Sequence, residues 1–275
     1  MTTAVYKFFE EILKRESGLI ITPDKIYLLE SRLIPVASKH GIEGVEGIAR
    51  RLQQANDPVL LREVLEAMAT GETSFFRDAA PFERFKNNIL PPLLKERQAS
   101  RTLRILSAAC STGQEPYSIA MLLKDDPALL GWKCDILAVD FSSEALEYAA
   151  AAAYSQFEVQ RGLPVRQLVR HFTQDGEKWR LKPEVRDMVR FQQLNLLAEP
   201  AGLGVFDVIF CRNVLIYFDV PTKARVLQHL RGILRQDGAL FLGGTETVLG
   251  VTDVFKPVDA MPGLFLRNDS TLKIG

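Results

Sequence analysis

A loop near the middle of the sequence combines residue types that could bind a charged small molecule. It reads Ala108-Ala-Cys-Ser-Thr-Gly-Gln-Glu-Pro-Tyr117 and follows the apolar run Leu103–Ser107. Its only glycine is Gly113, so it lacks the GxGxxG pattern with which a dinucleotide pyrophosphate is held at a helix N-terminus. A carboxylate at Glu115 would repel a pyrophosphate and suits a cation such as an α-ammonium group. The alternative is a helix-start carboxylate stabilised by the helix dipole.

A second acidic residue, Asp140, ends the apolar run Lys133–Val139. An acidic residue at this place in an open parallel sheet typically accepts hydrogen bonds from ribose hydroxyls. The alternative is a loop aspartate that caps backbone N–H groups. Taken together, Glu115 and Asp140 suit a nucleoside with a positive amino-acid end. S-adenosylmethionine (SAM) fits that description, whereas a nicotinamide dinucleotide does not.

Two further segments place polar groups where elements end. Thr70–Asp78 carries Thr73 and Arg77 beside two phenylalanines, a pattern that is weak alone because such aromatics usually pack. Phe210–Asp219 carries Arg212 and Asn213 directly after an apolar run. Polar residues where a buried strand leaves the sheet are more typical of a binding site than of a solvated loop. Tyr217 of the same segment suits either a site or the core.

Hydrophobic periodicity predicts two kinds of architecture along the chain. Residues 1 to about 70 show helical spacing throughout and predict a small helical bundle. From about residue 102, short apolar runs alternate with helical segments, which predicts an α/β domain with a mostly parallel sheet. The expected strands are 103–107, 133–139, 189–194, 206–211 and 239–242, with an antiparallel pair at 254–258 and 264–266. A stretch of about 35 residues before 189 is too long for a plain connection, and it predicts an inserted hairpin at 170–173 and 178–182.

Composition narrows the function classes. The 275-residue chain has 34 basic and 34 acidic side chains and zero net charge, so nucleic acid is not expected as a partner. Three cysteines, Cys110, Cys134 and Cys211, form no CxxC pair and predict neither a zinc site nor a disulfide framework. The start of the sequence shows no signal-peptide pattern. No run approaches the roughly 18 apolar residues of a membrane span, and we expect a reduced, cytoplasmic protein.

Four segments occur in a fixed order over nearly the whole chain: Thr70–Arg77, Ala108–Ala120, Asn195–Leu197 and Phe206–Phe218. They closely resemble the motifs of the chemotaxis receptor methyltransferases of the CheR type. This resemblance implies a Rossmann-like SAM-dependent methyltransferase domain of the α/β class, with an N-terminal helical domain and a small inserted β-subdomain. We place the helical domain at 1–70, a linker and connecting helix at 71–101, and the SAM-binding domain at 102–275 with the insertion at about 155–188.

The resemblance also implies the activity. Members of the family transfer the methyl group of SAM to glutamate side chains on the cytoplasmic helices of chemoreceptors, leaving S-adenosylhomocysteine. We expect no metal, no membrane insertion and a monomer. Two alternatives from the residues remain: a small-molecule methyltransferase on the same sheet, and a non-catalytic SAM-sensing adaptor.

By motif position, the resemblance implies that Thr73, Arg77 and Glu115 lie at the methionine end of SAM. Asp140 would hold the ribose. The family often has Asn where this chain has Gly71, which puts one cofactor contact in doubt, and often a second acidic residue at Gln114.

The remaining motif positions concern the adenine and the methyl group. Asn195 and Leu196 would hold the adenine, while Arg212 and Asn213 would close the pocket. Tyr217 would flank the transferred methyl group together with Arg77.

The basic residues of the expected second helix suggest a surface for a partner. Lys25, Arg32 and Lys39 are seven residues apart, so they share one face of the second expected helix and could dock an acidic receptor bundle. A solvated face is the alternative, and Pro35 is expected to kink or restart the helix. The hairpin turn Gln174–Lys178 is short, which argues against dependence on a receptor tether peptide.

Overall fold

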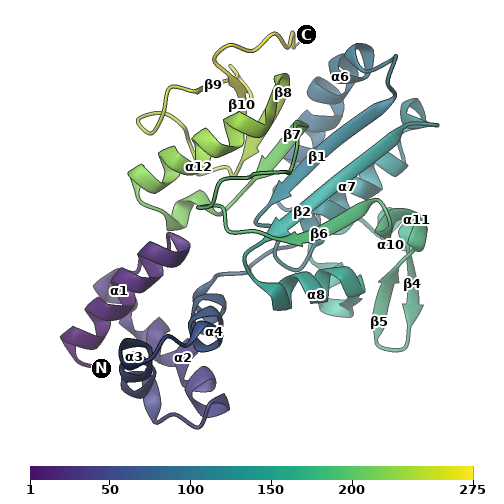
Figure 1. Cartoon of the computed structure of the whole chain (residues 1–275). Helices are drawn as coiled ribbons and strands as arrows, with labels where there is room; N and C mark the ends of the chain where they lie inside the picture. Colours follow the sequence, from purple (N-terminus) through teal and green to yellow (C-terminus); the bar gives the residue numbers. More distant parts are fainter. Residues whose placement is uncertain (275) are drawn as a thin grey trace. The chain divides into compact units, whose positions relative to one another are not determined.

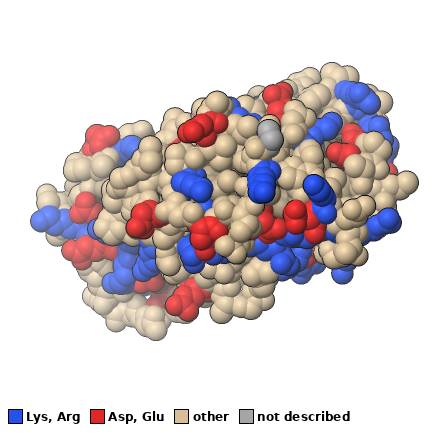
Figure 2. Space-filling view, turned by 90° about the horizontal axis from the view of Figure 1, so that it is seen from above, with Lys and Arg blue, Asp and Glu red and all other residues tan. Residues whose placement is uncertain are grey.

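The computed structural model describes residues 1–274, in two compact units. One unit comprises Met1–Thr70 together with Tyr217–Thr222, and the other comprises Gly71–Ile216 together with Lys223–Gly275. Among the residues described, no helix has the length and apolarity that a bilayer crossing requires. Figure 2 shows Lys and Arg intermixed with Asp and Glu over the face that it presents, in keeping with the balanced composition.

The first unit is helical, as its spacing predicts. It contains α1 (Thr3–Ser17), the 3-10 turn η1 (Pro23–Lys25), α2 (Ile26–Lys39), α3 (Gly44–Gln54) and α4 (Pro58–Met68). Local chemistry sets the helix ends: Gly18 closes α1 in the left-handed conformation at φ 77°, and the Asp57 side chain accepts from the backbone N–H of Leu60 at the start of α4. The expected restart at Pro35 is wrong, because α2 continues through this proline.

The second unit contains the predicted α/β sheet. Its strands are β1 (Thr102–Ala108), β2 (Lys133–Asp140), β6 (Val189–Gln193), β7 (Phe206–Cys211), β8 (Leu234–Leu242), β9 (Phe255–Pro257) and β10 (Leu264–Arg267). Their order is β6-β2-β1-β7-β8-β10-β9. The first five run parallel and β10 and β9 complete the edge antiparallel, which confirms the predicted fold class.

Helices cover both faces of this sheet. They are α5 (Ala80–Arg84), one π-helical turn η2 (Phe85–Ile89), α6 (Leu90–Glu96), α7 (Gln114–Lys124), the 3-10 turn η3 (Pro127–Leu129), α8 (Ser143–Ala151) and α12 (Val220–Ile233). In the view of Figure 1, α6 and α7 pass behind the strands and α12 passes in front of them. Strands covered on both faces are mostly apolar. All six residues of β7 are buried, and the one charged residue among them, Asp207, is paired with Arg97.

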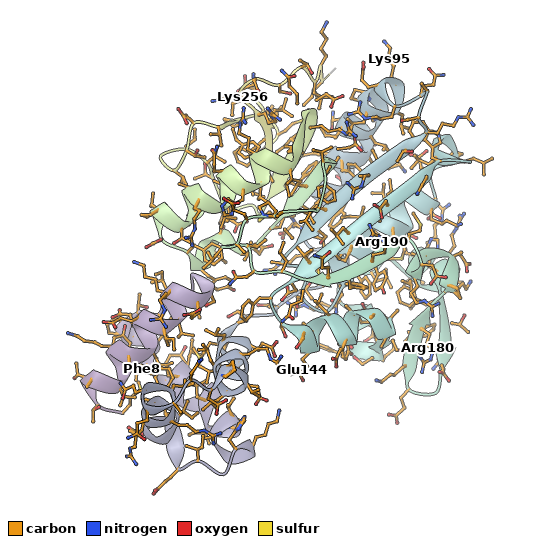
Figure 3. The ribbon with its side chains drawn as sticks, in the orientation of Figure 1. Phe8, Lys95, Glu144, Arg180, Arg190 and Lys256 are labelled. Atoms are coloured by element: carbon orange, nitrogen blue, oxygen red, sulfur yellow. The ribbon has the colours of Figure 1, made fainter. Side chains whose placement is uncertain are left out.

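A smaller sheet is formed by a segment inserted in the sequence between β2 and β6 of the main sheet. It has the order β3-β5-β4, from β3 (Ala153–Ser155), β4 (Phe172–Asp175) and β5 (Lys178–Leu181). The helices α9 (Gln156–Gln160), α10 (Val165–His171) and α11 (Pro183–Arg186) accompany it. The predicted hairpin is therefore present, with Arg180 on it in Figure 3. The sequence did not predict β3, whose three residues are too few to show alternation.

The pairing of β2 with β6 brings two predicted site segments together. At the amino ends of these strands, Arg190 of β6, marked in Figure 3, donates to Asp135 of β2 at 2.9 Å. At the carboxyl ends, the backbone N–H of Leu194 donates to the carbonyl oxygen of Asp140 at 2.9 Å. The residue after Leu194 is Asn195, so the turn expected to hold adenine begins beside Asp140.

Candidate cofactor and catalytic site

The carboxyl ends of β2, β1 and β7 meet at one edge of the main sheet. Ala108, the last residue of β1, is paired with Val139 of β2 on one side and with Cys211 of β7 on the other. The loops that carry Glu115, Asp140 and Arg212 therefore leave the sheet at the same level. Ligands of open parallel sheets bind at this edge.

The loop after β1 folds tightly. Ala109, Ser111 and Gly113 all adopt positive φ, at 58°, 51° and 92°. A Cβ on Gly113 would lie 2.8 Å from the Cβ of Ala149 and 3.0 Å from the hydroxyl of Tyr154, so only glycine fits there without displacement. The close approach of loop and helix α8 explains the single glycine of the motif.

Asp140 holds this loop in place. Its Oδ2 accepts from the backbone N–H of Ser111 at 2.8 Å, and its Oδ1 accepts from the N–H of Ser142 at 2.9 Å. This is the capping role that the sequence left open as an alternative. A carboxylate has about four acceptor positions, so capping is compatible with a further hydrogen bond from a hydroxyl.

Asn195 and Leu196 form the turn that follows β6. Asn195 Oδ1 accepts from the backbone N–H of Leu197 at 3.0 Å, and the ring nitrogen Nδ1 of His229 lies 3.4 Å from the carbonyl oxygen of Leu196. Both residues are partly buried. Their place beside Asp140 suits the two ends of a nucleoside.

Glu115 stands at the first turn of α7 and is 9% exposed. Its Oε1 accepts from the hydroxyl of Ser107 at 2.8 Å, and its Oε2 accepts from Arg212 Nη1 at 3.0 Å. The carboxylate is thus half of a buried ion pair across the sheet edge. The sequence predicted that Glu115 either binds a cationic ligand or stabilises the start of a helix, and neither prediction included an ion pair with Arg212.

Arg212 links three segments at the end of β7. Besides Glu115, its Nη2 donates to Asp78 Oδ2 at 3.0 Å and to the carbonyl oxygen of Arg77 at 2.8 Å. Its guanidinium also lies over the ring of Phe82, 5.5 Å from the centroid. The side chain is only 2% exposed, and its Nε has no hydrogen-bond partner among the residues described.

The segment with Thr73 and Arg77 is anchored by its aromatic residue Phe75. That ring is fully buried and packs edge-on against Tyr154 and Phe172, with centroids 5.0 and 5.7 Å away. Arg77 turns back and donates from Nη1 to the carbonyl oxygen of Glu72 at 2.7 Å. The expected packing of the aromatics therefore coexists with a partly exposed Arg77.

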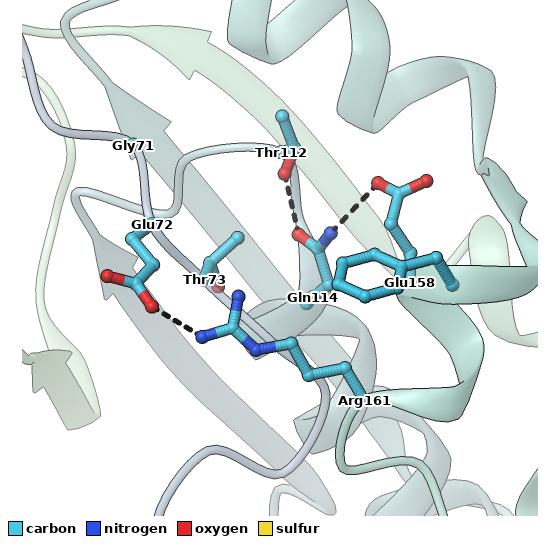
Figure 4. A pocket seen from close by; sticks show the side chains of 8 residues that line it. Gly71, Glu72, Thr73, Thr112, Gln114, Glu158 and Arg161 are labelled. Atoms are coloured by element: carbon cyan, nitrogen blue, oxygen red, sulfur yellow. Dashed lines mark hydrogen bonds and ion pairs between the residues drawn. The ribbon is translucent and has the colours of Figure 1, made fainter.

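A pocket of about 180 Å³ opens beside this segment (Figure 4). Thr73, Thr112 and Gln114 line one part of it, where the Thr112 hydroxyl donates to Gln114 Oε1 at 2.8 Å. Arg161 crosses it to form an ion pair with Glu72. The pocket is polar and belongs to the second unit.

Sequence reasoning missed Glu246. This residue lies in the loop after β8, is 8% exposed, and accepts backbone N–H groups from the loop after β7, including that of Asn213 at 2.8 Å. Asn213 itself has a positive φ of 59°. The sequence signal was a glutamate shortly after the Gly-Gly pair that ends the last parallel strand.

Tyr217 belongs to the first unit, whereas the residues predicted to bind SAM belong to the second. Its carbonyl oxygen accepts from the backbone N–H of Ile20 at 2.9 Å. Two residues on, Asp219 forms an ion pair with Lys14 at 2.8 Å. This pair and the N–H of Thr222 hold the pKa of Asp219 at about 2.

The basic residues of α2 are partly engaged within the first unit. Arg32 donates from Nη1 to the carbonyl oxygen of Met68 at 2.8 Å, at the end of α4. Lys39 pairs with Glu63 of α4 at 3.1 Å. Lys25 precedes the α-helix, in the turn η1. These bonds favour a structural role for Arg32 and Lys39 beside the docking role that the sequence suggested.

The cysteines near the sheet edge are suited to packing. Burial raises the pKa of the Cys110 and Cys211 thiols well above their usual value. Nearby carboxylates add to the effect, those of Asp140 and Glu115 at Cys110 and those of Glu246 and Glu115 at Cys211. A thiol so disfavoured as thiolate is a poor nucleophile. Among residues 1–274, no group of three or more His, Cys, Asp or Glu side chains is arranged to hold a metal ion.

The polar groups at the sheet edge fit SAM. Asp140 and the Asn195 turn offer acceptors for a nucleoside, and the carboxylate of Glu115 suits a cation. The buried Nε of Arg212, without a partner among the residues described, suits an acceptor such as a carboxylate. A dinucleotide would instead meet a carboxylate at the first turn of α7.

Comparison with known proteins shows the family to which this chain is related. The family described as "CheR methyltransferase, SAM binding domain" matches residues 71–263. "Chemotaxis protein methyltransferase 1" of Pseudomonas aeruginosa is 39% identical over 270 residues, covering 96% of this chain and 97% of its own. "Chemotaxis protein methyltransferase Cher2" of Pseudomonas putida is 36% identical, covering 95% of this chain and 97% of its own.

The fold and the site therefore define a SAM-dependent methyltransferase. More narrowly, the chain belongs to the CheR methyltransferase family.

Proposed function

We propose that this protein transfers the methyl group of SAM to glutamate side-chain carboxylates of chemoreceptors, forming glutamyl methyl esters in sensory adaptation. The supporting observation is the similarity over almost the whole length to proteins named chemotaxis protein methyltransferases. A small-molecule methyltransferase or a SAM-sensing adaptor is not favoured by these matches.

The reaction requires little acid–base chemistry from the protein. When bound, SAM supplies an electrophilic methyl group on a sulfonium. A glutamate carboxylate has an ordinary pKa of about 4.3 and is ionised near neutrality, so no general base is needed. The work of the protein is to bind both reactants, align them and exclude water.

We assign the binding roles as follows. Asp140 accepts from the ribose, and Asn195 with Leu196 holds the adenine. Thr73 and Glu115 lie at the methionine end. The ion pair between Glu115 and Arg212, at 3.0 Å, supports this assignment because it orients the carboxylate before the cofactor binds.

We assign the methyl-transfer roles to Arg77 and Tyr217. Arg77 steers the incoming carboxylate, and Tyr217 orients it, while Arg212 and Asn213 close the pocket. The steering contact must stay loose, because a tight ion pair with the carboxylate would stabilise the ground state and slow transfer.

The partner, domain and location proposals rest on the family. We propose that the protein works as a cytoplasmic monomer without a metal. Its helical domain is residues 1–70, its linker 71–101 and its SAM-binding domain 102–275, with an insertion at about 155–188. The β4–β5 hairpin has a two-residue turn, Gly176 and Glu177, and we propose that methylation does not need a receptor tether peptide.

The deciding experiment is labelling with tritiated SAM. Membranes that contain the organism's chemoreceptors are incubated with the purified protein, and base-labile methyl ester is counted on the receptor band. We expect label that increases with time and disappears after alkali treatment. Tight SAM binding without label on any receptor would support the adaptor alternative instead. Label on small molecules only would support the small-molecule enzyme.

A further inference from the structure

Glu246 ties together the loops that follow β7 and β8. Its Oε2 accepts from the backbone N–H of Gly243 at 2.6 Å and from that of Asn213 at 2.8 Å, and its Oε1 accepts from that of Ile216 at 3.2 Å. The residue is 8% exposed. Hydrogen bonds to a charged acceptor in such a place are worth more than neutral ones.

The two loops that Glu246 joins lie in close contact. β7 and β8 are paired up to Cys211 and Leu242, so their loops leave the sheet side by side. A Cβ on Gly243 would lie 2.8 Å from Asn213 Nδ2 and 2.7 Å from Glu246 Oε2. Glu246 also closes its own turn, since its N–H donates to the carbonyl oxygen of Gly243 at 2.9 Å.

The loop after β7 carries residues with proposed roles. It contains Arg212 and Asn213, and Ile216 is the residue before Tyr217. Asn213 adopts a positive φ of 59°, a conformation that is held here through its N–H. A shift of about 1 Å in groups that align reactants can cost about 100-fold in rate.

We propose that Glu246 is a positioning residue for methyl transfer. By accepting the N–H groups of Asn213 and Ile216, it holds the loop that carries Arg212 and leads into Tyr217. This inference rests on the proposed function, because its rate effect needs the methyl-transfer reaction. It assigns no contact between Glu246 and either reactant.

Two variants separate the contacts of Glu246. In Glu246→Gln, the amide oxygen replaces Oε2 and keeps Asn213 and Gly243, while the amide nitrogen faces the N–H of Ile216. We expect kcat for receptor methylation to fall about tenfold with the KM for SAM within about threefold. Glu246→Ala loses all three bonds, and we expect a fall in kcat of about 100-fold.

The matched control is Asp207→Asn. Asp207 is 1% exposed, lies at the start of the same strand β7, and accepts from Arg97 at 2.8 Å and from the N–H of Arg104 at 2.7 Å. This variant removes a buried carboxylate of similar burial at the other end of β7. We expect it to lower the melting temperature while leaving kcat near the wild-type value.

The results distinguish positioning from plain stability. The proposal would be overturned if the Glu246 variants, like the control, have a lower melting temperature but keep the wild-type kcat. An S-adenosylhomocysteine affinity that falls as much as kcat would overturn it too, because the defect would then lie in cofactor binding.

Amide hydrogen exchange at Ile216 tests the same link without any reaction. We expect exchange about tenfold faster in Glu246→Ala than in the wild type. Failure of the wild type to methylate receptors would refute the proposed function, and unchanged exchange at Ile216 would refute the role of Glu246 independently.

Discussion

Arg212 Nη1 donates to Glu115 Oε2 at 3.0 Å, joining the end of β7 to the start of α7 across the carboxyl edge of β1. Both residues are buried: the side chain of Arg212 is 2% exposed and that of Glu115 is 12% exposed, against 9% for the whole of residue Glu115. A buried ion pair stabilises a protein only when its geometry and other hydrogen bonds offset desolvation. Here Ser107 satisfies the second oxygen of Glu115, and Asp78 with the Arg77 carbonyl satisfies the second nitrogen of Arg212.

Breaking this pair is expected to affect stability and cofactor binding differently. Glu115→Gln removes the buried one of the two carboxylates that pair with Arg212 and leaves only the exposed Asp78, and we expect destabilisation of about 3 kcal/mol. We also expect weaker binding of S-adenosylhomocysteine. The double variant Glu115→Gln with Arg212→Met removes both charges and should recover stability but not affinity. Urea unfolding and calorimetry measure the two effects. Recovery of affinity in the double variant would show that Glu115 serves only Arg212.

Arg77→Ala is expected to separate catalysis from binding. The Arg77 side chain donates to the carbonyl oxygen of Glu72 and is partly exposed. We expect receptor methylation to fall about 100-fold, with S-adenosylhomocysteine affinity largely retained. The matched control is Arg166→Ala, an exposed arginine of α10. Equal losses of methylation and affinity would assign Arg77 to cofactor binding instead.

The ion pair between Lys14 and Asp219 predicts a pH dependence of stability. Lys14 and Thr222 lower the pKa of Asp219 to about 2, below the value of about 3.9 in an unfolded chain. The pair's stabilisation is therefore fully present above about pH 4 and is lost as the pH falls through about 2. Asp219→Asn keeps an acceptor for the N–H of Thr222 but loses the pair. Its melting temperature should lie below the wild-type value at pH 7, and the difference should shrink as the pH falls through about 2 and vanish below it. A constant difference over this range would contradict the assignment.

The docking hypothesis is best tested at Lys25. Reversing Arg32 would remove its bond to the carbonyl oxygen of Met68 and disturb the fold, whereas Lys25 stands before α2. We expect Lys25→Glu to raise the KM for receptor and to reduce the salt dependence of methylation, since an attractive charge is replaced by a repulsive one. Lys256→Glu on β9, marked in Figure 3, is the control. If Lys25→Glu and Lys256→Glu change the KM for receptor and the salt dependence equally, Lys25 has no specific docking role.

Local patterns were sufficient to predict the main elements. Apolar runs and helical spacing predicted the five parallel strands, the antiparallel edge pair and the helices of residues 1–70, because burial selects these periods residue by residue. That Asp140 and the Asn195 turn lie at the same edge was expected for parallel strands, but their adjacency depends on the pairing of β2 with β6, which only the structure shows. The strand β3 was not predicted, because three residues are too few to show an alternating hydrophobic pattern.

By itself, the sequence determined the fold class, the family and the loops that carry Glu115, Asp140, Arg77 and Arg212. Only the tertiary structure decided what these side chains touch. The ion pair of Glu115 with Arg212 joins residues 97 positions apart. The hydrogen bond from the N–H of Asn213 to Glu246 joins residues 33 positions apart. No local pattern encodes such contacts, because they depend on how strands and loops pack in space. The same reason explains Arg32, whose spacing suggested a free basic face and whose guanidinium instead caps the end of α4.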